Sequence, residues 1–128
     1  MDVIEEKVPR LMMFLKDKAR RRSAISYSAV FNFFDSNTHR SDVWETFEEA
    51  CRRIAPAEEA IYGALLAKKD TNLPSTGSYD IYKNIRHEEY LSITGVKRFE
   101  AYDLTLDQMG EIAQLERDKV YQHAIENT

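Results

Sequence analysis

The sequence predicts an α+β fold, in which helices pack over one β-hairpin in a single domain of 128 residues. The first observation behind this prediction is the segment 58–84, EEAIYGALLAKKDTNLPSTGSYDIYKN, where two short runs of β-type residues flank a turn-rich centre. Pro74 and Gly77 punctuate that centre, and Asp70 and Asn72 tolerate its backbone angles. The second observation is helical periodicity on both sides of the segment. Because a lone hairpin is barely stable in water, those helices must cover it.

Residues 8–20 are expected to form the first helix. Pro9 fits its first turn, where a missing amide proton breaks no hydrogen bond. The C-terminal end of this helix is basic, which suits the negative end of the helix dipole and also suits contact with phosphates or an acidic partner. The apolar residues at helical spacing are Ile4, Val8, Leu11, Met12 and Leu15.

A short strand over residues 24–27 is expected next, followed by two further helices. Ser28 can cap the first of them, residues 29–34, and Ser41 can cap the second, residues 42–54. The apolar stripe of the second helix consists of Val43, Trp44, Phe47, Ala50, Cys51 and Ile54.

After the hairpin, the chain is expected to be helical at two places. Residues 86–91 can form one turn, and Gly95 breaks the stretch that follows. Thr105 and Gln108 form a capping box before a long helix that reaches about Ala124. Its apolar side, which is expected to pack on the domain or on a second copy in a homodimer, consists of Met109, Ile112, Ala113, Val120 and Ala124. The solvated side is expected to carry Glu116, Arg117, Asp118 and Lys119.

This order of elements (helix, strand, helix, helix, hairpin) is that of a winged helix-turn-helix domain. Residues 41–54 are then the expected recognition helix, and residues 68–77 are the tip of the β-hairpin wing. The core of the domain is expected to span residues 8–84, with a C-terminal helical extension over residues 85–128. Such a fold favours nucleic-acid binding, although a fold alone does not determine a function.

Three stretches of the chain also carry a family resemblance. They are ISYSAVFNFF at residues 25–34, ALLAKKDTNLPSTGSYDIYK at residues 64–83 and LERDKVYQHA at residues 115–124. Together they resemble the strand and second helix, the hairpin and the ending of a family of small, uncharacterised bacterial winged-helix-like domains. Asn72 and Ser75 stand where the hairpin of that family has glycines. The resemblance implies a winged-helix fold in a bacterial or phage context, and it implies no particular activity.

The composition bounds the function further. Hydrophobic residues make up 43% of the chain and charged residues 31%, as in ordinary soluble domains. No apolar run approaches the ~20 residues that a membrane span needs. The start of the chain lacks a signal-peptide pattern, so a cytoplasmic protein with no membrane contact is expected. The single cysteine, Cys51, has no disulfide partner, and no Gly-rich phosphate loop is present, so no cofactor and no small-molecule substrate are predicted.

The charge is unevenly distributed along the chain. Residues 1–40 carry 8 Lys/Arg and 5 Asp/Glu, a net charge of +3, whereas residues 41–128 carry 10 and 17, a net charge of −7. A DNA-contacting face could therefore only be local. The alternative interpretation of its residues is solvation of a helix end and, for the lysines, protection of an edge strand. The candidate nucleic-acid-binding residues are Lys16, Lys18, Arg20, Arg21, Arg22, Arg40, Lys68 and Lys69.

Two binding functions remain, and no enzyme is predicted. Cys51 is expected to be a buried core thiol, and the three histidines lack the spacing of a metal pair. The first function is that of a DNA-binding winged-helix regulator. The alternative is a protein–protein interaction module, or an inhibitor, whose acidic helix 41–54 binds a nucleic-acid-processing protein. A surplus of tyrosines in the second half could also mark an interface: Tyr79, Tyr82, Tyr90, Tyr102 and Tyr121.

Overall fold

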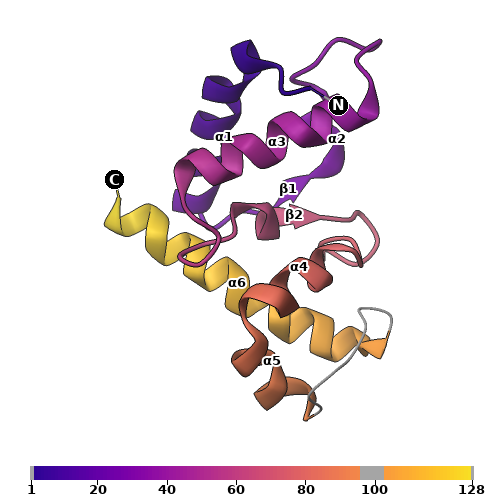
Figure 1. Cartoon of the computed structure of the whole chain (residues 1–128), viewed down its shortest axis with the longest axis vertical. Coiled ribbons are helices and arrows are strands. Elements are labelled where there is room, and N and C mark those ends of the chain that lie inside the picture. Colours follow the sequence, from indigo (N-terminus) through magenta and orange to yellow (C-terminus); the bar gives the residue numbers. More distant parts are fainter. Residues whose placement is uncertain (1, 96–102, 128) are drawn as a thin grey trace.

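The computed structural model of the chain describes residues 2–95 and 103–127 (Figure 1). It is mostly helical, with 66% helix and 3% strand. The described residues form six α-helices, two short 3-10 helices and one parallel pair of strands. In chain order the elements are η1 (Glu5–Lys7), α1 (Val8–Arg20), β1 (Ile25–Ser26), α2 (Tyr27–Phe31), α3 (Arg40–Ile54), η2 (Tyr62–Leu65), β2 (Leu66–Ala67), α4 (Ser78–Ile85), α5 (His87–Thr94) and α6 (Leu106–Glu126).

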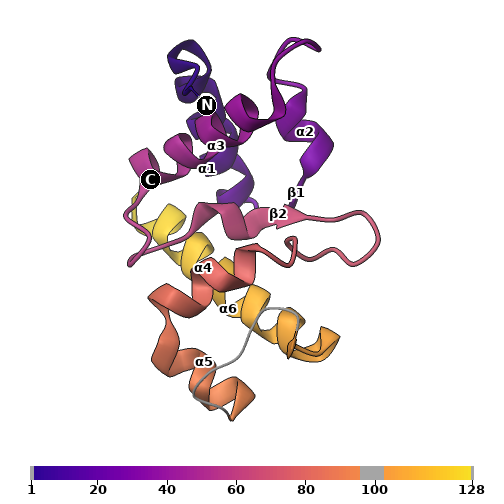
Figure 2. The ribbon, with the colours of Figure 1, turned by 45° about the vertical axis from the view of Figure 1, so that its right-hand side comes forward.

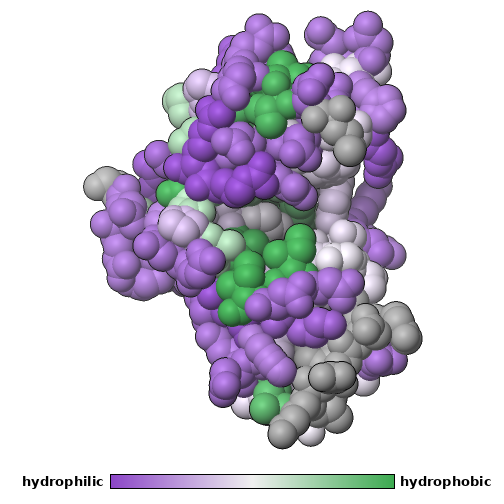
Figure 3. Space-filling model, in the orientation of Figure 1, coloured by the Kyte–Doolittle hydropathy of each residue, from purple (hydrophilic) through white to green (hydrophobic). Residues whose placement is uncertain are grey.

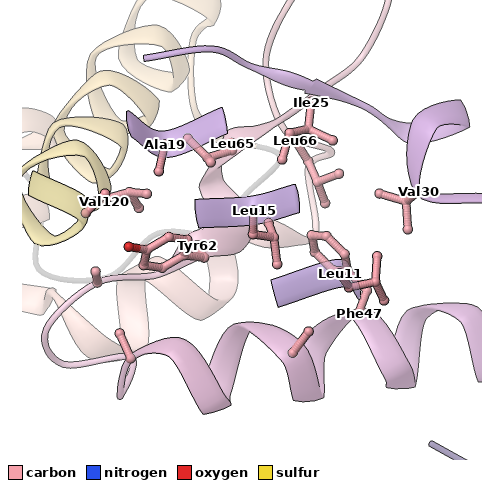
Figure 4. Packing of buried hydrophobic residues seen from close by; sticks show 14 of the residues in the cluster. Leu11, Leu15, Ala19, Ile25, Val30, Phe47, Tyr62, Leu65, Leu66 and Val120 are labelled. Atoms are coloured by element: carbon pink, nitrogen blue, oxygen red, sulfur yellow. The ribbon is translucent and has the colours of Figure 1, made fainter. Parts of the chain in front are cut away.

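The first helix forms as its apolar periodicity predicts. Helix α1 begins at Val8 with Pro9 in its first turn, and it buries Val8, Leu11, Leu15 and Ala19 completely or almost completely. These side chains pack against Phe47 of α3 and Tyr62 of η2 in the main hydrophobic core (Figure 4). The expectation for this helix is therefore confirmed, and its partner is the helix 42–54 that the sequence also predicts.

The predicted β-hairpin is wrong, and with it the α+β winged-helix fold. Its first arm forms η2 and then β2, and β2 pairs in parallel with β1 through Ile25↔Leu66 and Ser26↔Ala67. Its second arm is the helix α4, in which Tyr79 and Tyr82 lie three residues apart and are both buried. That spacing places both rings on one side of a helix, where they meet the second core. No hairpin wing exists among the described residues.

The helices α2 and α3 begin two residues before their predicted positions. Ser26, not Ser28, caps α2, because its hydroxyl accepts a hydrogen bond from the Ala29 amide at 3.2 Å. His39, not Ser41, caps α3, because its Nδ1 accepts from the amide of Ser41 at 3.1 Å. The short strand predicted before α2 is confirmed as β1, and α3 ends at Ile54 as expected.

Helix α6 joins two hydrophobic cores. Its capping box is confirmed: the Gln108 amide donates to the Thr105 hydroxyl at 3.1 Å, and the Thr105 amide donates to Gln108 Oε1 at 2.9 Å. Near its start Ile112 packs into the second core, whereas Val120 and Ala124 pack into the main core. Figures 1 and 2 show α6 running from the α4–α5 end of the molecule to the end of α1. Its predicted apolar side is thus largely buried within the chain itself.

The expected solvent exposure of two charged residues on α6 is wrong. Glu116 is fully buried and Arg117 is 6% exposed. Glu116 accepts from Nε of the buried Arg86 at 3.2 Å, and Arg86 also donates to the carbonyls of Ala57 at 3.0 Å and Glu58 at 2.9 Å. These polar contacts bind α6 to the chain on both sides of α4, and they explain how the charges can be buried.

The chain between the hairpin segment and α6 is more helical than predicted. Instead of one turn over residues 86–91, α5 extends from His87 to Thr94, and Gly95 ends it in the left-handed conformation with φ of 75°. Three of the surplus tyrosines, Tyr79, Tyr82 and Tyr90, are at most 1% exposed and belong to the second core. Tyr102 lies outside the described residues. None of the described helices combines the length and apolar character that crossing a membrane requires.

Candidate functional site

A groove with a volume of about 550 Å³ lies between α3 on one side and the η2 and α4 segments on the other. In Figure 3 it is visible as a hollow near the middle of the molecule, with hydrophilic residues above it and hydrophobic residues below it. Its walls are mostly apolar. The aromatic members are Tyr27, Trp44, Phe47, Tyr62 and Tyr82, and the aliphatic members include Ile61, Leu66 and Ile81.

One wall of the groove is a stripe along α3. Trp44, Phe47 and Cys51 follow each other at three- and four-residue spacing, which places them on one side of the helix. Trp44 is the only tryptophan of the chain. Its ring meets three other rings edge to face: Tyr27 at 5.5 Å, Phe31 at 5.2 Å and Phe47 at 5.6 Å between centroids. Such edge-to-face contacts hold the wall in one arrangement.

The opposite wall is fixed by two hydrogen bonds, one to α6 and one across the groove lining. The hydroxyl of Tyr62 lies 2.9 Å from Nδ1 of His123 on α6, and burial raises the pKa of Tyr62 to about 12. The amide of Ser75 donates to the hydroxyl of Tyr27 at 2.9 Å, which holds the loop before α4 against α2. Ile81 of α4 is 49% exposed at the edge of this wall. The groove is therefore braced before any ligand arrives, and it offers an exposed apolar edge.

The two arginines of the groove differ in their ionic partners. Arg52 is neutralised within α3, because it pairs with Glu49 at 2.9 Å and with Glu48 at 3.9 Å. Arg40 lies with its guanidinium 5.4 Å from the centre of the Phe31 ring. The described part of the chain places no carboxylate in an ion pair with Arg40. Arg40 is thus the cation that the groove leaves uncompensated.

The groove lining includes one thiol, that of Cys51. Cys51 is half-buried: it packs against the main core, as a core thiol is predicted to do, and it also lines the groove. Burial raises the pKa of Cys51 well above its ordinary range, which keeps it as a poorly nucleophilic thiol. Residues 2–95 and 103–127 contain no cluster of His, Cys, Asp and Glu that could hold a metal ion. The arrangement suits the binding of an apolar group beside an anion.

The eight predicted nucleic-acid-binding residues lie in three places. Lys16, Lys18, Arg20, Arg21 and Arg22 occupy the C-terminal end of α1 and the turn after it, and we call this cluster the basic end of α1. Arg40 begins α3 at the groove. Lys68 and Lys69 follow β2 and are exposed. Because β1 and β2 are parallel, the basic end of α1 precedes one end of the strand pair, and the two lysines follow the other end. The structure does not bring all eight together.

Within the basic end of α1, most cations pack on aromatic rings or on the helix itself. Arg21 pairs with Asp17 at 3.3 Å, and the Arg20 Nε donates to the Lys16 carbonyl at 3.2 Å. Lys18 lies 5.5 Å from the Phe14 ring centre, and Arg22 lies 5.5 Å from that of Tyr121. These contacts hold the side chains close to the surface while their charges remain in water.

The sequence predicts core or strand positions for the residues of the groove. It predicts Trp44 and Phe47 in the buried stripe of a helix, and Tyr62 and Ile81 in the arms of a hairpin. The sequence feature that hints at the groove is the excess of aromatic residues near Arg40. Only the packing of α3 against η2 and α4 brings these aromatic residues together around one groove. No family model, no curated protein and no solved structure matches this chain.

Proposed function

We propose that this protein is a non-catalytic binding protein, and that the groove between α3 and α4 receives a short amphipathic helix of a partner protein. The observation that carries the proposal is the aromatic lining of the groove, which includes Trp44, together with the exposed Ile81. Exposed apolar surface beside aromatic side chains is typical of protein–protein contact sites. A volume of about 550 Å³ is also within the range of ligand-binding clefts.

A helix suits this groove better than an extended strand does. Binding by strand addition needs an exposed sheet edge, and here each strand has only two residues. The groove, in contrast, runs between the helices α3 and α4, and a helix with apolar residues at three- and four-residue spacing can place its side chains there. Helix α3 also carries Glu48 and Glu49, which would repel the phosphates of DNA.

The test uses peptides selected from a displayed random library, each ~15 residues long, or about four helical turns. Selection on the wild-type protein is followed by titration of tryptophan-free peptides, with the fluorescence of Trp44 as the signal. We expect apolar peptides that change this fluorescence and that bind the Ile81→Asp variant at least about tenfold more weakly, since the substitution puts a charge at the apolar contact. The matched control is Met13→Asp, since Met13 is 71% exposed on α1 and lies outside the groove. Equal binding to both variants contradicts the proposal.

A second candidate function is the binding of a polyanion such as duplex DNA by the basic end of α1. Five of the seven residues 16–22 are basic, and one of the seven is acidic. In the described part of the chain, Arg21 is the member of this cluster with a carboxylate partner. Its test is fluorescence anisotropy with mixed-sequence duplex DNA from low to physiological salt. Binding that weakens steeply with salt supports it, provided that alanine at Arg20, Arg21 and Arg22 reduces the affinity and alanine at Lys68 and Lys69 does not. Absence of binding at low salt contradicts it.

A further inference from the structure

We infer that the partner helix carries a carboxylate beside its apolar anchors, and that Arg40 binds this carboxylate at the rim of the groove. The inference rests on the proposed function, because it concerns the same groove and names the chemistry of its occupant. It also places that carboxylate, since Arg40 is the first residue of α3 and therefore marks one end of the groove wall.

The side chain of Arg40 is held in a position from which it can bind an anion. Its guanidinium lies over the face of Phe31 at 5.4 Å, and Phe31 in turn meets Trp44 edge to face at 5.2 Å. This cation–π contact holds the guanidinium against the ring, and the N–H groups that do not point at the ring can still bind an anion. A carboxylate can take two such N–H groups at once, and less side-chain freedom is lost because the ring already restrains the side chain.

The other charges of the groove make Arg40 the place for this carboxylate. Arg52 already pairs with Glu48 and Glu49, so it offers little attraction to a further acid. Glu48 lies eight positions after Arg40, ~12 Å further along the helix at 1.5 Å per residue. Its charge disfavours a partner carboxylate at that end. An acidic group on the occupant is therefore attracted to the start of α3 and repelled from its middle.

The experiment uses the peptides selected on the wild-type protein and their matched amides, in which each Asp or Glu is replaced by Asn or Gln. Affinities for wild-type protein, Arg40→Gln and Arg40→Lys are measured through Trp44 fluorescence. We expect the wild-type protein to bind the acidic peptide about fivefold more tightly than the amide, as for a partly exposed ion pair. Arg40→Gln should abolish this preference, Arg40→Lys should retain part of it, and added salt should reduce it. The control is Arg10→Gln, which removes one charge from an exposed position on α1 outside the groove.

The outcomes separate this inference from the proposed function. Peptides that lack an acidic position, or equal binding of acid and amide by the wild-type protein, overturn the inference; if Ile81→Asp still weakens binding, the proposed function stands. If Ile81→Asp has no effect on any selected peptide, or if no peptide is selected, both are overturned. Acidic peptides without apolar anchors, whose binding depends on Arg20, Arg21 and Arg22, would also overturn both and would point to the basic end of α1.

Discussion

Replacing Arg117 by methionine should strongly destabilise the fold, because this buried arginine donates hydrogen bonds to three backbone carbonyls. Its Nε donates to the carbonyl of Ala64 at 2.7 Å, and its Nη2 donates to those of Leu66 at 3.0 Å and Asn72 at 3.1 Å. Methionine keeps the apolar length of the side chain and removes every donor. The first two of these hydrogen bonds are buried, so water cannot easily replace the arginine there.

The expected loss follows from those two carbonyls. A buried acceptor left without a partner costs ~1–3 kcal/mol, and water can reach the exposed Asn72, so the total is about 3 kcal/mol. The entropy of unfolding for 128 residues is about 270 cal/mol/K at the midpoint, which converts this loss into a melting temperature lower by about 11 °C. Circular dichroism during heating measures the midpoint, and urea unfolding gives the free energy independently.

The matched control for this substitution is Lys119→Met on the same helix. Lys119 pairs with Glu89 at 3.0 Å, but both side chains are partly exposed, so the expected loss is below about 1 kcal/mol. If Arg117→Met lowers the melting temperature no more than Lys119→Met does, the three carbonyls do not depend on the guanidinium and the reasoning is refuted. Amide hydrogen exchange adds a local readout, since the segment after β2 should exchange faster in Arg117→Met alone.

Three further predictions concern Glu116, two glycines and Cys51. Burial raises the pKa of Glu116 above its ordinary value of 4.5, so the folded state keeps this proton at pH values where the unfolded chain has lost it. The urea stability of wild type relative to Glu116→Gln should therefore fall as the pH rises above about 4.5, and a constant difference would contradict this. Gly95→Ala should lower the free energy of unfolding by about 1 kcal/mol, because φ at this position is 75°. Gly110→Ala should raise it by ~0.5–1 kcal/mol, because Gly110 lies inside α6 with open space around its Cβ position. Thermal melts in which the two substitutions do not shift the midpoint in opposite directions would refute this pair of predictions. Cys51 should react with iodoacetamide more slowly than a free thiol, because burial raises its pKa. The reaction should slow further when a selected peptide fills the groove, which Cys51 lines. Labelling at the rate of a free thiol would contradict both statements.

The parts of the fold that the sequence predicts are those that local interactions determine. Helix α1 follows from the spacing of its own apolar residues, and the start of α6 follows from the reciprocal hydrogen bonds of Thr105 and Gln108. Both patterns lie within a few neighbouring residues. No partner from elsewhere in the chain is needed to recognise them.

The hairpin prediction fails because strand pairing is not a local property. The run from Ile61 to Leu66 is apolar and suits a strand, but its partner is Ile25, across α2 and α3, and not the segment beyond the turn. Tyr79 and Tyr82 are aromatic residues, which favour strands, although their spacing of three also fits a helix. The contact of their rings with the second core decides between the two.

The buried charges and the groove escape prediction for a similar reason. Glu116 and Arg117 stand among alternating charges, as solvated residues do, and their burial depends on Arg86 and on the carbonyls near β2. The groove forms where α3 meets η2 and α4, so none of these segments contains it alone. A pattern within one segment cannot reveal a site that arises between segments.

The position of α6 has a consequence for how the chain folds during synthesis. Val120 and Ala124, near the end of this helix, fill the same core as Val8, Leu11 and Leu15 of α1. While the ribosome still holds the chain short of residue 117, α1 and α3 have left the exit tunnel but lack these partners, and the carbonyls near β2 lack their arginine. The apolar faces of these early helices therefore stay exposed until α6 has been synthesised. During this interval the chain presents the largest apolar surface to which a chaperone can bind.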